Sequence, residues 1–338
     1  GGLRYLEQYA FGLVREALNE REVLLNMAPH LIEPARFILP HSKGMRPKWL
    51  LRLGLFFYDY LGGRKILPAS HSVDLTTHKA GQALNGSLKA GFEYSDCKVD
   101  DTRLTLLNAM SAEELGAEIL TQTKVETLTE DGGGWNVVLS SNPDRQLGDA
   151  SDGRQVSAKL VVNAAGPWVD DLRVLNNSKK GKQLHLTKGV HLVFPYEKLP
   201  VKQSVYFDIP DGRMMFAIPR GKITYVGTTD TNYNDNKDKV RTDIADAIYL
   251  ISAVNNMFPD INLELDDIVS SWAGLRPLIH EEGKSASELS RKDEIFVSDT
   301  GLISIAGGKL TGYRKMAERI VDLVTKKHKR RFEKEFDD

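Results

Sequence analysis

The sequence predicts an α/β protein that combines a mixed or antiparallel sheet with a smaller set of strand-to-helix units. Residues 159–168 and 303–314 each run from a β-branched strand through small residues into a helix, which is typical of α/β units. Between them, residues 192–279 contain short alternating strands around one helix at 242–257. We therefore expect two structural parts, one of them built on an extended sheet.

Periodicity and turn residues locate the other elements. Helices are predicted at 6–25, from residue 100 to near Gly116, and at 313–324. Strands are predicted at 118–128, 135–140 and 155–162, with a hairpin turn at 132–134 and a polar loop at 141–153. A strand pair after Glu294 leads into the stretch at 303–314. The charged tail at 326–338 is assigned no function, because its basic block is followed at once by acids.

Composition describes a globular protein without a general attraction to nucleic acid. The chain has 338 residues, 41% of them hydrophobic, which is enough for one large or two ordinary domains. Its 45 basic and 46 acidic residues nearly cancel, so a nucleic-acid partner is not expected. The single Cys97 excludes an intrachain disulfide and suits a reducing compartment, and no apolar run reaches the roughly 18–20 residues of a membrane span. The first residues, GGLRYLE, have neither an initiator Met nor a signal-peptide pattern, so we expect a piece of a longer protein.

The apolar run at 49–61 has two interpretations. It could be a helix at a membrane surface, or a core or interdomain helix interrupted by Arg52 and Asp59. The run is too short to span a bilayer and lacks a basic polar face. We therefore favour the core or interdomain helix.

The two strand-to-helix junctions are candidate ligand sites. Small residues after a strand let main-chain N–H groups approach a bulky ligand, and ligands collect at the carboxyl ends of strands in α/β sheets. Close packing of a helix on a strand explains the same residues equally well. The second junction is not a Walker A loop, and the sequence contains no Gly-x-Gly-x-x-Gly. The small residues concerned are Ala164, Ala165 and Gly166 at one junction and Gly307 and Gly308 at the other.

Three cations stand next to Gly or Pro, namely Arg4, Arg276 and Lys309. A rigid neighbour suits a fixed contact with a phosphate or carboxylate better than a mobile surface charge does. Taken singly, each is explained by an ordinary surface charge, but the three together predict a small anionic substrate. Metal chemistry is not expected, because the eight histidines form no His-x-x-x-His pattern and one cysteine makes no thiolate cluster. A serine nucleophile is not expected either, because Gly-x-Ser-x-Gly is missing.

Five motifs in order carry a resemblance to a known family: GGLRYLE at 1–7, NAAGPWVD at 163–170, VGTTDT at 226–231, WAGLRPL at 272–278 and IAGGKLTGYRKMAE at 305–318. Over roughly residues 1–325 the chain resembles the FAD-dependent glycerol-3-phosphate dehydrogenases of the D-amino-acid-oxidase-like flavoprotein superfamily. The resemblance implies oxidation of sn-glycerol 3-phosphate to dihydroxyacetone phosphate by hydride transfer from C2 to FAD, with electrons passed to membrane quinone. It also implies a cytoplasmic protein, peripheral on the inner face of the cell membrane, and it allows a homodimer.

Other readings of the resemblance remain open. A soluble oxidase of the same family would pass the electrons to oxygen and release peroxide. An amine or amino-acid oxidase is expected to use a carboxylate clamp and not this Arg and Lys set. A truncated, non-catalytic fragment of such an enzyme would bind no flavin.

The resemblance also implies a division of the chain. A discontinuous, Rossmann-like FAD-binding domain, incomplete here, would comprise 1–27, 99–182 and 299–325. A substrate-binding domain with a mixed or antiparallel sheet would comprise 28–98 and 183–298, followed by the charged tail at 326–338.

The resemblance assigns roles to individual residues. Arg276 and Lys309 would be catalytic, because cations stabilise a developing carbonyl. The implied substrate-binding residues are Arg4, Tyr5, Thr228, Arg276, Arg291 and Lys309. The implied cofactor-binding residues are Val125, Ala164, Ala165, Gly166, Trp168, Gly307, Gly308, Leu310 and Thr311.

The chain departs from the family pattern in three places. The amino-terminal strand with Gly-x-Gly-x-x-Gly, the histidine before the Gly1-Gly2 pair and the carboxyl-terminal helical domain are all missing from the sequence. That histidine is the general base that the resemblance favours. We therefore expect an incomplete flavin site.

Overall fold

The computed structural model describes residues 3, 10–42, 45–63, 66–140, 153–280 and 293–332, with side chains described up to residue 326. The chain divides into two compact units. Unit 1 contains Gly1–Asp100 and Lys188–Leu275, and unit 2 contains Asp101–Thr187 and Arg276–Asp338. The division into a flavin domain and a substrate domain stays a prediction, because packing does not reveal which unit binds which ligand.

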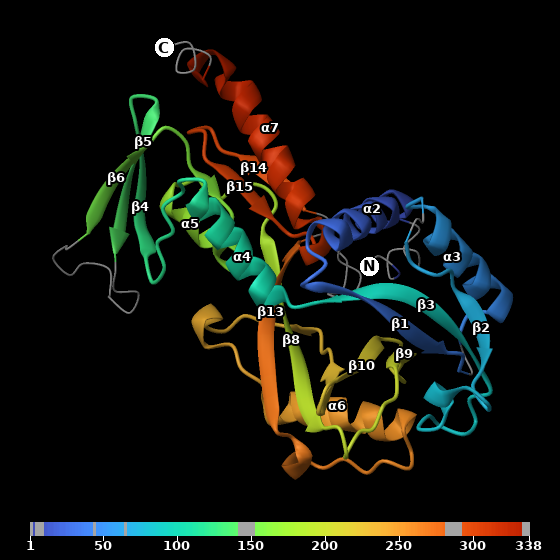
Figure 1. The fold of residues 1–338 in the computed structure, drawn as a ribbon. Helices are drawn as coiled ribbons and strands as arrows, with labels where there is room; N and C mark the ends of the chain where they lie inside the picture. Colours follow the sequence, from blue (N-terminus) through green and yellow to red (C-terminus); the bar gives the residue numbers. More distant parts are fainter. Residues whose placement is uncertain are drawn as a thin grey trace. The chain divides into compact units, whose positions relative to one another are not determined.

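Unit 1 is built on a large sheet, as the alternating pattern at 192–279 predicted. Its strand order is β12-β8-β11-β10-β9-β1-β3-β2, with β13 paired to β8 (Figure 1). Most neighbours are antiparallel, and β1 runs parallel to β9, so the sheet is mixed. The strands are β1 (Ile32–Pro40), β2 (His71–Asp74), β3 (Ala90–Val99), β8 (Leu184–Pro195), β9 (Ser204–Asp208), β10 (Met214–Arg220), β11 (Ile223–Gly227), β12 (Thr231–Asn232) and β13 (Ser270–Ile279).

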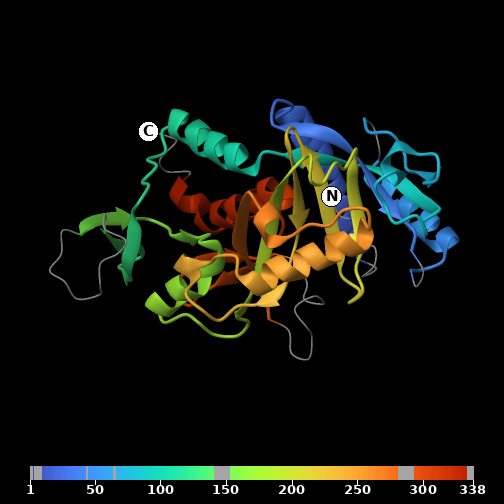
Figure 2. The same ribbon diagram turned by 90° about the horizontal axis from the view of Figure 1, so that it is seen from below.

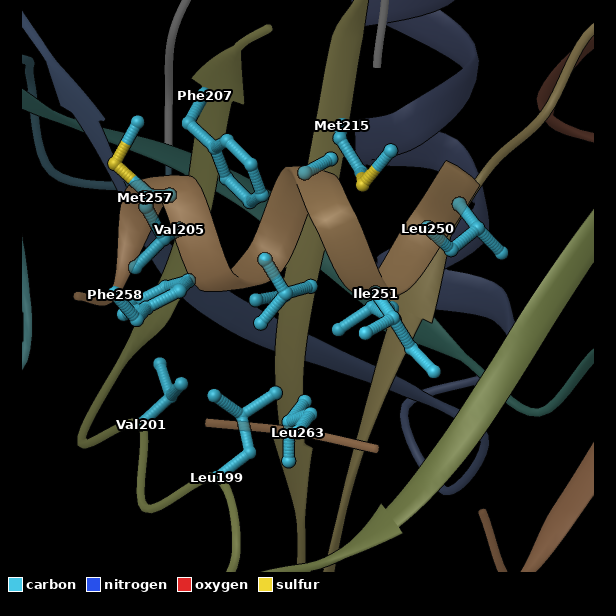
Figure 3. Close-up of a cluster of buried hydrophobic side chains, with 14 of the residues drawn as sticks. Leu199, Val201, Val205, Phe207, Met215, Leu250, Ile251, Met257, Phe258 and Leu263 are labelled. Atoms are coloured by element: carbon cyan, nitrogen blue, oxygen red, sulfur yellow. The ribbon is translucent and has the colours of Figure 1, made fainter. Parts of the chain in front are cut away.

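Helix α6 (Ile244–Met257) covers one face of this sheet (Figure 2). The helix begins two residues after the predicted start at 242, because Asp243 and Asp246 form a capping box with bonds of 2.9 and 3.2 Å to each other's backbone N–H. Leu250 and Val254 of α6 belong to one cluster with strand residues such as Phe207, and all three are fully buried. Figure 3 shows Leu250 and Phe207 in this cluster. This cluster is the main hydrophobic core of unit 1.

The helices α2 (Phe11–Met27) and α3 (Lys48–Tyr60) contribute to a second cluster of unit 1. Helix α2 ends before Pro29, as predicted, while residues 6–9 of the predicted helix lie outside the described residues. Helix α3 confirms the helical interpretation of the apolar run, and its Leu55 and Tyr58 are buried with Phe37 and Tyr94 of the sheet. One face of α3 is therefore a core face.

Unit 2 contains two three-stranded sheets. One has the order β4-β5-β6 and the other β14-β15-β7. The turn at 132–134 joins β4 to β5 as predicted, with Gly132 and Gly133 both at positive φ, which suits a tight hairpin. The strands are β4 (Lys124–Asp131), β5 (Gly134–Ser140), β6 (Arg154–Ala158), β7 (Val162–Asn163), β14 (Glu294–Val297) and β15 (Ile303–Ala306), and the helices are α4 (Asp101–Glu114), α5 (Val169–Leu175) and α7 (Tyr313–Phe332).

Two predicted strands differ from the structure, and strand β1 is not among the predicted elements. The strand predicted at 155–162 is two strands, because β6 pairs with β5 whereas β7 pairs with β15 in another sheet. The strand predicted at 118–128 begins only at Lys124. The sequence does not indicate β1 as a strand, because it contains prolines at 34 and 40. Its parallel pairing to β9 is limited to Phe37 and Ile38, so neither proline takes part in that pairing.

No helix within the described part of the chain is long and apolar enough to cross a membrane.

Candidate functional site

The structure brings the two strand-to-helix junctions together at one edge of a sheet. Strand β7 is parallel to β15, with Val162 opposite Ile303 and Asn163 opposite Ser304. The carboxyl ends of neighbouring parallel strands lie on the same side of a sheet. The turn after β7, at 164–166, and the turn after β15, at 307–308, therefore emerge side by side, where α/β sheets usually bind ligands.

A buried asparagine links the two junctions. The side-chain amide of Asn163 donates to the Val169 carbonyl at 2.9 Å and to the Ser304 hydroxyl at 3.2 Å, and its oxygen accepts from the Ala165 N–H at 3.3 Å. Asn163 and Ser304 are each 1% exposed. Because a buried amide is costly without partners, this set of bonds holds the first turn against the second strand.

A buried ion pair fixes the helix that follows the first turn. Asp170, in the first turn of α5, lies 2.8 Å from Arg173 and also accepts from the Leu184 N–H at 2.9 Å. Arg173 donates to the carbonyls of Lys180 and Lys182 and lies 4.5 Å from the centre of the Phe296 ring. Asp170 therefore has a structural role in holding the first turn of α5.

The glycines of the two turns are needed for different reasons. Gly166, Gly307 and Gly308 all have positive φ, between 55° and 81°, which favours glycine. A Cβ at Gly308 would lie 2.5 Å from the sulfur of Met316, so the packing of α7 also requires glycine there. A Cβ at Gly166 would meet nothing within 4 Å. The space beside the backbone is therefore open at Gly166 and filled by α7 at Gly308.

The rim of these turns suits a flat, largely apolar ligand. Ala164, Trp168 and Leu310 are exposed, and none of them carries a charge. Thr311 is half-buried in the short 3-10 helix Leu310–Gly312, which follows Lys309 and leads into α7. A flavin ring placed along this rim would meet small and apolar side chains, so these predicted cofactor residues fit such a group.

Val125 lies in another part of unit 2. It packs in the apolar cluster of the β4-β5-β6 sheet with Leu302 and Val161, which precede β15 and β7. The two turns instead adjoin a cluster that contains Val169 and Ala306. Within unit 2, the structure thus gathers the small residues of the turns and leaves Val125 apart from that cluster.

The predicted catalytic cations both belong to unit 2. Lys309 directly follows the second glycine turn, and Arg276 lies on β13; both are half-buried. On β13, Ile279 packs with Val169 and Ala306, which places the end of that strand beside both junctions. Arg276 is three residues earlier, which is about 10 Å along a strand.

Thr228 belongs to unit 1 and follows β11. Its hydroxyl donates to the Thr229 carbonyl at 3.1 Å. The neighbouring Thr229 is buried, accepts from the Val190 N–H at 3.0 Å and donates to the Lys188 carbonyl at 3.4 Å. The backbone at Thr228 is therefore held to β8 through the hydrogen bonds of Thr229.

Lys188 anchors that same part of β8 to α6. Its ammonium lies 2.7 Å from Asp243 and 2.6 Å from Asp246. Burial alone would lower the pKa of Lys188, but the hydrogen bonds to the two carboxylates raise it above the usual value. The same ammonium lowers the pKa of Asp243. Lys188 and Asp243 are therefore both charged at neutral pH.

His191 is a residue that sequence reasoning missed. It lies opposite Gly227 in the β8–β11 pairing, and a Cβ at Gly227 would come within 2.2 Å of the imidazole. The ring stacks on Trp272, with centroids 4.9 Å apart and an interplanar angle of 12°. The imidazole therefore sits beside the residue that precedes Thr228. No sequence motif marks it, because the pairing of β8 with β11 creates this proximity.

Three predicted substrate residues, Arg4, Tyr5 and Arg291, lie outside the described residues. Among the residues that are described, no group of three His, Cys, Asp or Glu side chains is placed to hold a metal ion.

Comparison with known proteins gives a consistent picture. A model of the family described as FAD dependent oxidoreductase (DAO) matches residues 1–314. The aerobic glycerol-3-phosphate dehydrogenase of Bacillus subtilis (strain 168) is 47% identical over 344 residues, covering 99% of this chain and 60% of that protein. The protein of the same name from Staphylococcus saprophyticus is 45% identical over 341 residues, covering 100% of this chain and 60% of that protein. The chain thus spans about 60% of the length of these curated relatives.

Solved structures show the same fold. The glycerol-3-phosphate dehydrogenase from Bacillus halodurans, crystallised with FAD, superposes with a TM-score of 0.73 at 42% identity, covering 94% of this chain and 55% of that one. The FAD-bound L-alpha-glycerophosphate oxidase from Mycoplasma pneumoniae superposes with a TM-score of 0.68 at 17% identity, covering 88% of this chain and 74% of that one. At that identity the second likeness concerns the fold alone.

Proposed function

We propose that this chain, which belongs to the FAD dependent oxidoreductase family, forms the substrate-facing and much of the flavin-facing part of an enzyme that oxidises sn-glycerol 3-phosphate to dihydroxyacetone phosphate. The observation that carries the proposal is the parallel pair β7–β15, which ends in two adjacent glycine turns followed by Lys309. The names of the relatives support the choice of substrate.

The residues of unit 2 would bind either the cofactor or the substrate at such a site. FAD, when bound, supplies the acceptor for the hydride that leaves C2 of the substrate. Ala164, Gly166 and Leu310 would lie along the cofactor, since they are uncharged and line the open edge of the turns. Arg276 and Lys309 would bind the substrate phosphate and the oxygen on C2, where a cation stabilises negative charge.

Unit 1 contains Thr228, a predicted substrate residue, and His191 close to it in the sheet. Thr228 would bind the substrate, and His191 lies against the residue just before it. A neutral imidazole has one ring nitrogen without a proton, and that nitrogen can accept one. We propose His191 as the residue of this chain that accepts the proton of the C2 hydroxyl.

The electron acceptor is part of the proposal. We propose membrane quinone, with the protein peripheral on the inner face of the cell membrane, because the named relatives are dehydrogenases. The oxidase alternative predicts stoichiometric hydrogen peroxide. Oxygen uptake in the absence of quinone, equal to the rate with a quinone analogue, would favour the oxidase.

An anaerobic absorbance spectrum tests the central proposal. The purified protein, supplied with FAD, is expected to show a flavin band that bleaches with sn-glycerol 3-phosphate and not with glycerol or an amino acid. Arg276→Ala and Lys309→Ala should bleach at least about a hundredfold more slowly. Lys124→Ala, a change at an exposed cation of β4, is the matched control. A protein that binds no flavin, or variants that react at the parental rate, would refute the assignment.

A further inference from the structure

Three residues of neighbouring strands lie around His191 on one face of the large sheet of unit 1. His191 lies on β8, Tyr225 and Gly227 lie on β11, and Trp272 lies on β13; both β11 and β13 pair with β8. His191 is directly opposite Gly227, and Tyr225 is two residues before Gly227, so these three share a face of the sheet. We refer to Tyr225, Gly227 and Trp272 as the His191 slot.

Two aromatic rings of the slot contact the imidazole. The indole of Trp272 is nearly parallel to it, with centroids 4.9 Å apart and an interplanar angle of 12°. The Tyr225 ring meets the imidazole at 62°, with centroids 6.3 Å apart, and its centroid lies 5.5 Å from that of the indole. Stacked and edge-on contacts at these distances are the favoured arrangements of aromatic rings. The plane of the imidazole is therefore set by its neighbours.

Gly227 forms the remaining side of the slot. A Cβ at this position would lie 2.2 Å from Cδ2 and 2.7 Å from Nε2 of His191, so a side chain there would displace the ring. Gly227 is not among the glycines with positive φ, so that conformation is not the reason for glycine here. The Cδ2–Nε2 edge of the imidazole thus lies against the backbone directly before Thr228, the predicted substrate residue.

Burial of apolar surface does not explain this stack. Trp272 is 46% exposed, and His191 is half-buried. On β8 and β11 the main hydrophobic core lies on the other face of the sheet, where Val190, Leu192 and Val226 are fully buried in the cluster of α6. The indole adds little to that core, but it does restrict rotation of the imidazole about χ2. A catalytic group whose orientation is already fixed by packing loses less freedom when the substrate binds.

We propose that Trp272 is a positioning residue for the proton transfer to His191, because its indole holds the imidazole against Gly227 in a single orientation. The inference rests on the proposed function, in which the proton of the C2 hydroxyl passes to the unprotonated nitrogen of a neutral imidazole and leaves an imidazolium. Trp272 contacts the imidazole and Tyr225, and it acts on the reaction through His191.

NMR of the histidine rings tests the orientation without any turnover. The purified chain is labelled with carbon-13 in its eight histidine rings, and His191→Gln identifies the His191 signals as those that disappear. Protons of a ring stacked on an indole face are shifted upfield by the ring current. We expect this shift in the parent and in Trp272→Phe, and its loss in Trp272→Ala. Trp49→Ala, at an exposed indole of α3, is the matched control and should leave the His191 signals unchanged.

Steady-state kinetics test the link to the reaction. Trp272→Ala should lower kcat about ten- to a hundredfold, because the imidazole is no longer held in place, while KM for sn-glycerol 3-phosphate should change less than about threefold. Trp272→Phe should restore most of the parental kcat. In the His191→Gln background, Trp272→Ala should cause no further loss, because its effect passes through the imidazole. Urea denaturation of each variant verifies that the fold is intact.

Three results would overturn the proposal: unchanged His191 signals in Trp272→Ala, a parental kcat in that variant, or the same loss of kcat when His191→Gln is already present. A parent protein that is supplied with FAD and oxidises no sn-glycerol 3-phosphate would refute the proposed function, and with it this role in proton transfer. The NMR comparison would then still decide whether Trp272 fixes the orientation of His191, so the two failures can be told apart.

Discussion

Replacement of Asn163 tests how the two junctions are held together. Asn163→Ala removes two donated bonds, of 2.9 and 3.2 Å, and one weaker accepted bond of 3.3 Å, at a site that is 1% exposed. Each such bond contributes about 0.5–1.5 kcal/mol net, and a buried group left without its partner costs more. We expect a loss of about 2–3 kcal/mol in the free energy of unfolding, measured by urea denaturation, and weaker flavin binding.

Asn163→Asp sharpens this test through its pH dependence. The variant keeps the size of the side chain but replaces the donor with an oxygen that faces the Val169 carbonyl and the Ser304 hydroxyl. Burial and this carbonyl would raise the pKa of the new carboxyl in the folded state above its unfolded value. The variant should therefore be less destabilised at pH 5 than at pH 7, because the folded state then binds the proton more tightly. A loss below about 1 kcal/mol for Asn163→Ala, or no pH dependence for Asn163→Asp, would refute the reasoning.

Three further predictions concern packing and charge in both units. Lys188→Met should lower the free energy of unfolding, measured by urea denaturation, by about 2–3 kcal/mol, because it leaves the 4%-exposed carboxylate of Asp246 without its cation. An unchanged urea midpoint would contradict a stabilising role for the Lys188–Asp246 pair. In the parent protein the contribution of the Lys188–Asp243 pair to stability should be lost as the pH rises through the raised pKa of Lys188, and as it falls through the lowered pKa of Asp243. A free energy of unfolding that is constant across both pH ranges would argue against this contribution. Gly308→Ala should lower the free energy of unfolding by about 1 kcal/mol more than Gly166→Ala does, because the added Cβ at 308 also contacts Met316. Gly166→Ala should chiefly weaken flavin affinity, measured by fluorescence titration. The reverse order of the two variants would refute the assignment of the two turns.

Local sequence signals predicted the elements that depend on nearby residues. The local pattern at 242–257 predicted α6, and the glycines at 132–134 predicted the hairpin of β4 and β5, because both are determined within a few residues of chain. The small residues after two β-branched strands identified both junctions as candidate ligand turns. The sequence by itself thus determined the α/β class, the family resemblance and the two turns.

Tertiary structure decided which of these segments meet. The motif around Asn163 does not indicate a distant partner for its side chain. The pairing of β7 with β15 brings Ser304 within hydrogen-bond distance of Asn163. His191 has no local signal at all, and only the pairing of β8 with β11 places it against Gly227. Likewise, the apolar run at 49–61 could not reveal which of its rings are buried, because exposure depends on what packs against each face of the helix. Partners far apart in the chain are set by long-range packing, and no pattern of neighbouring residues encodes them.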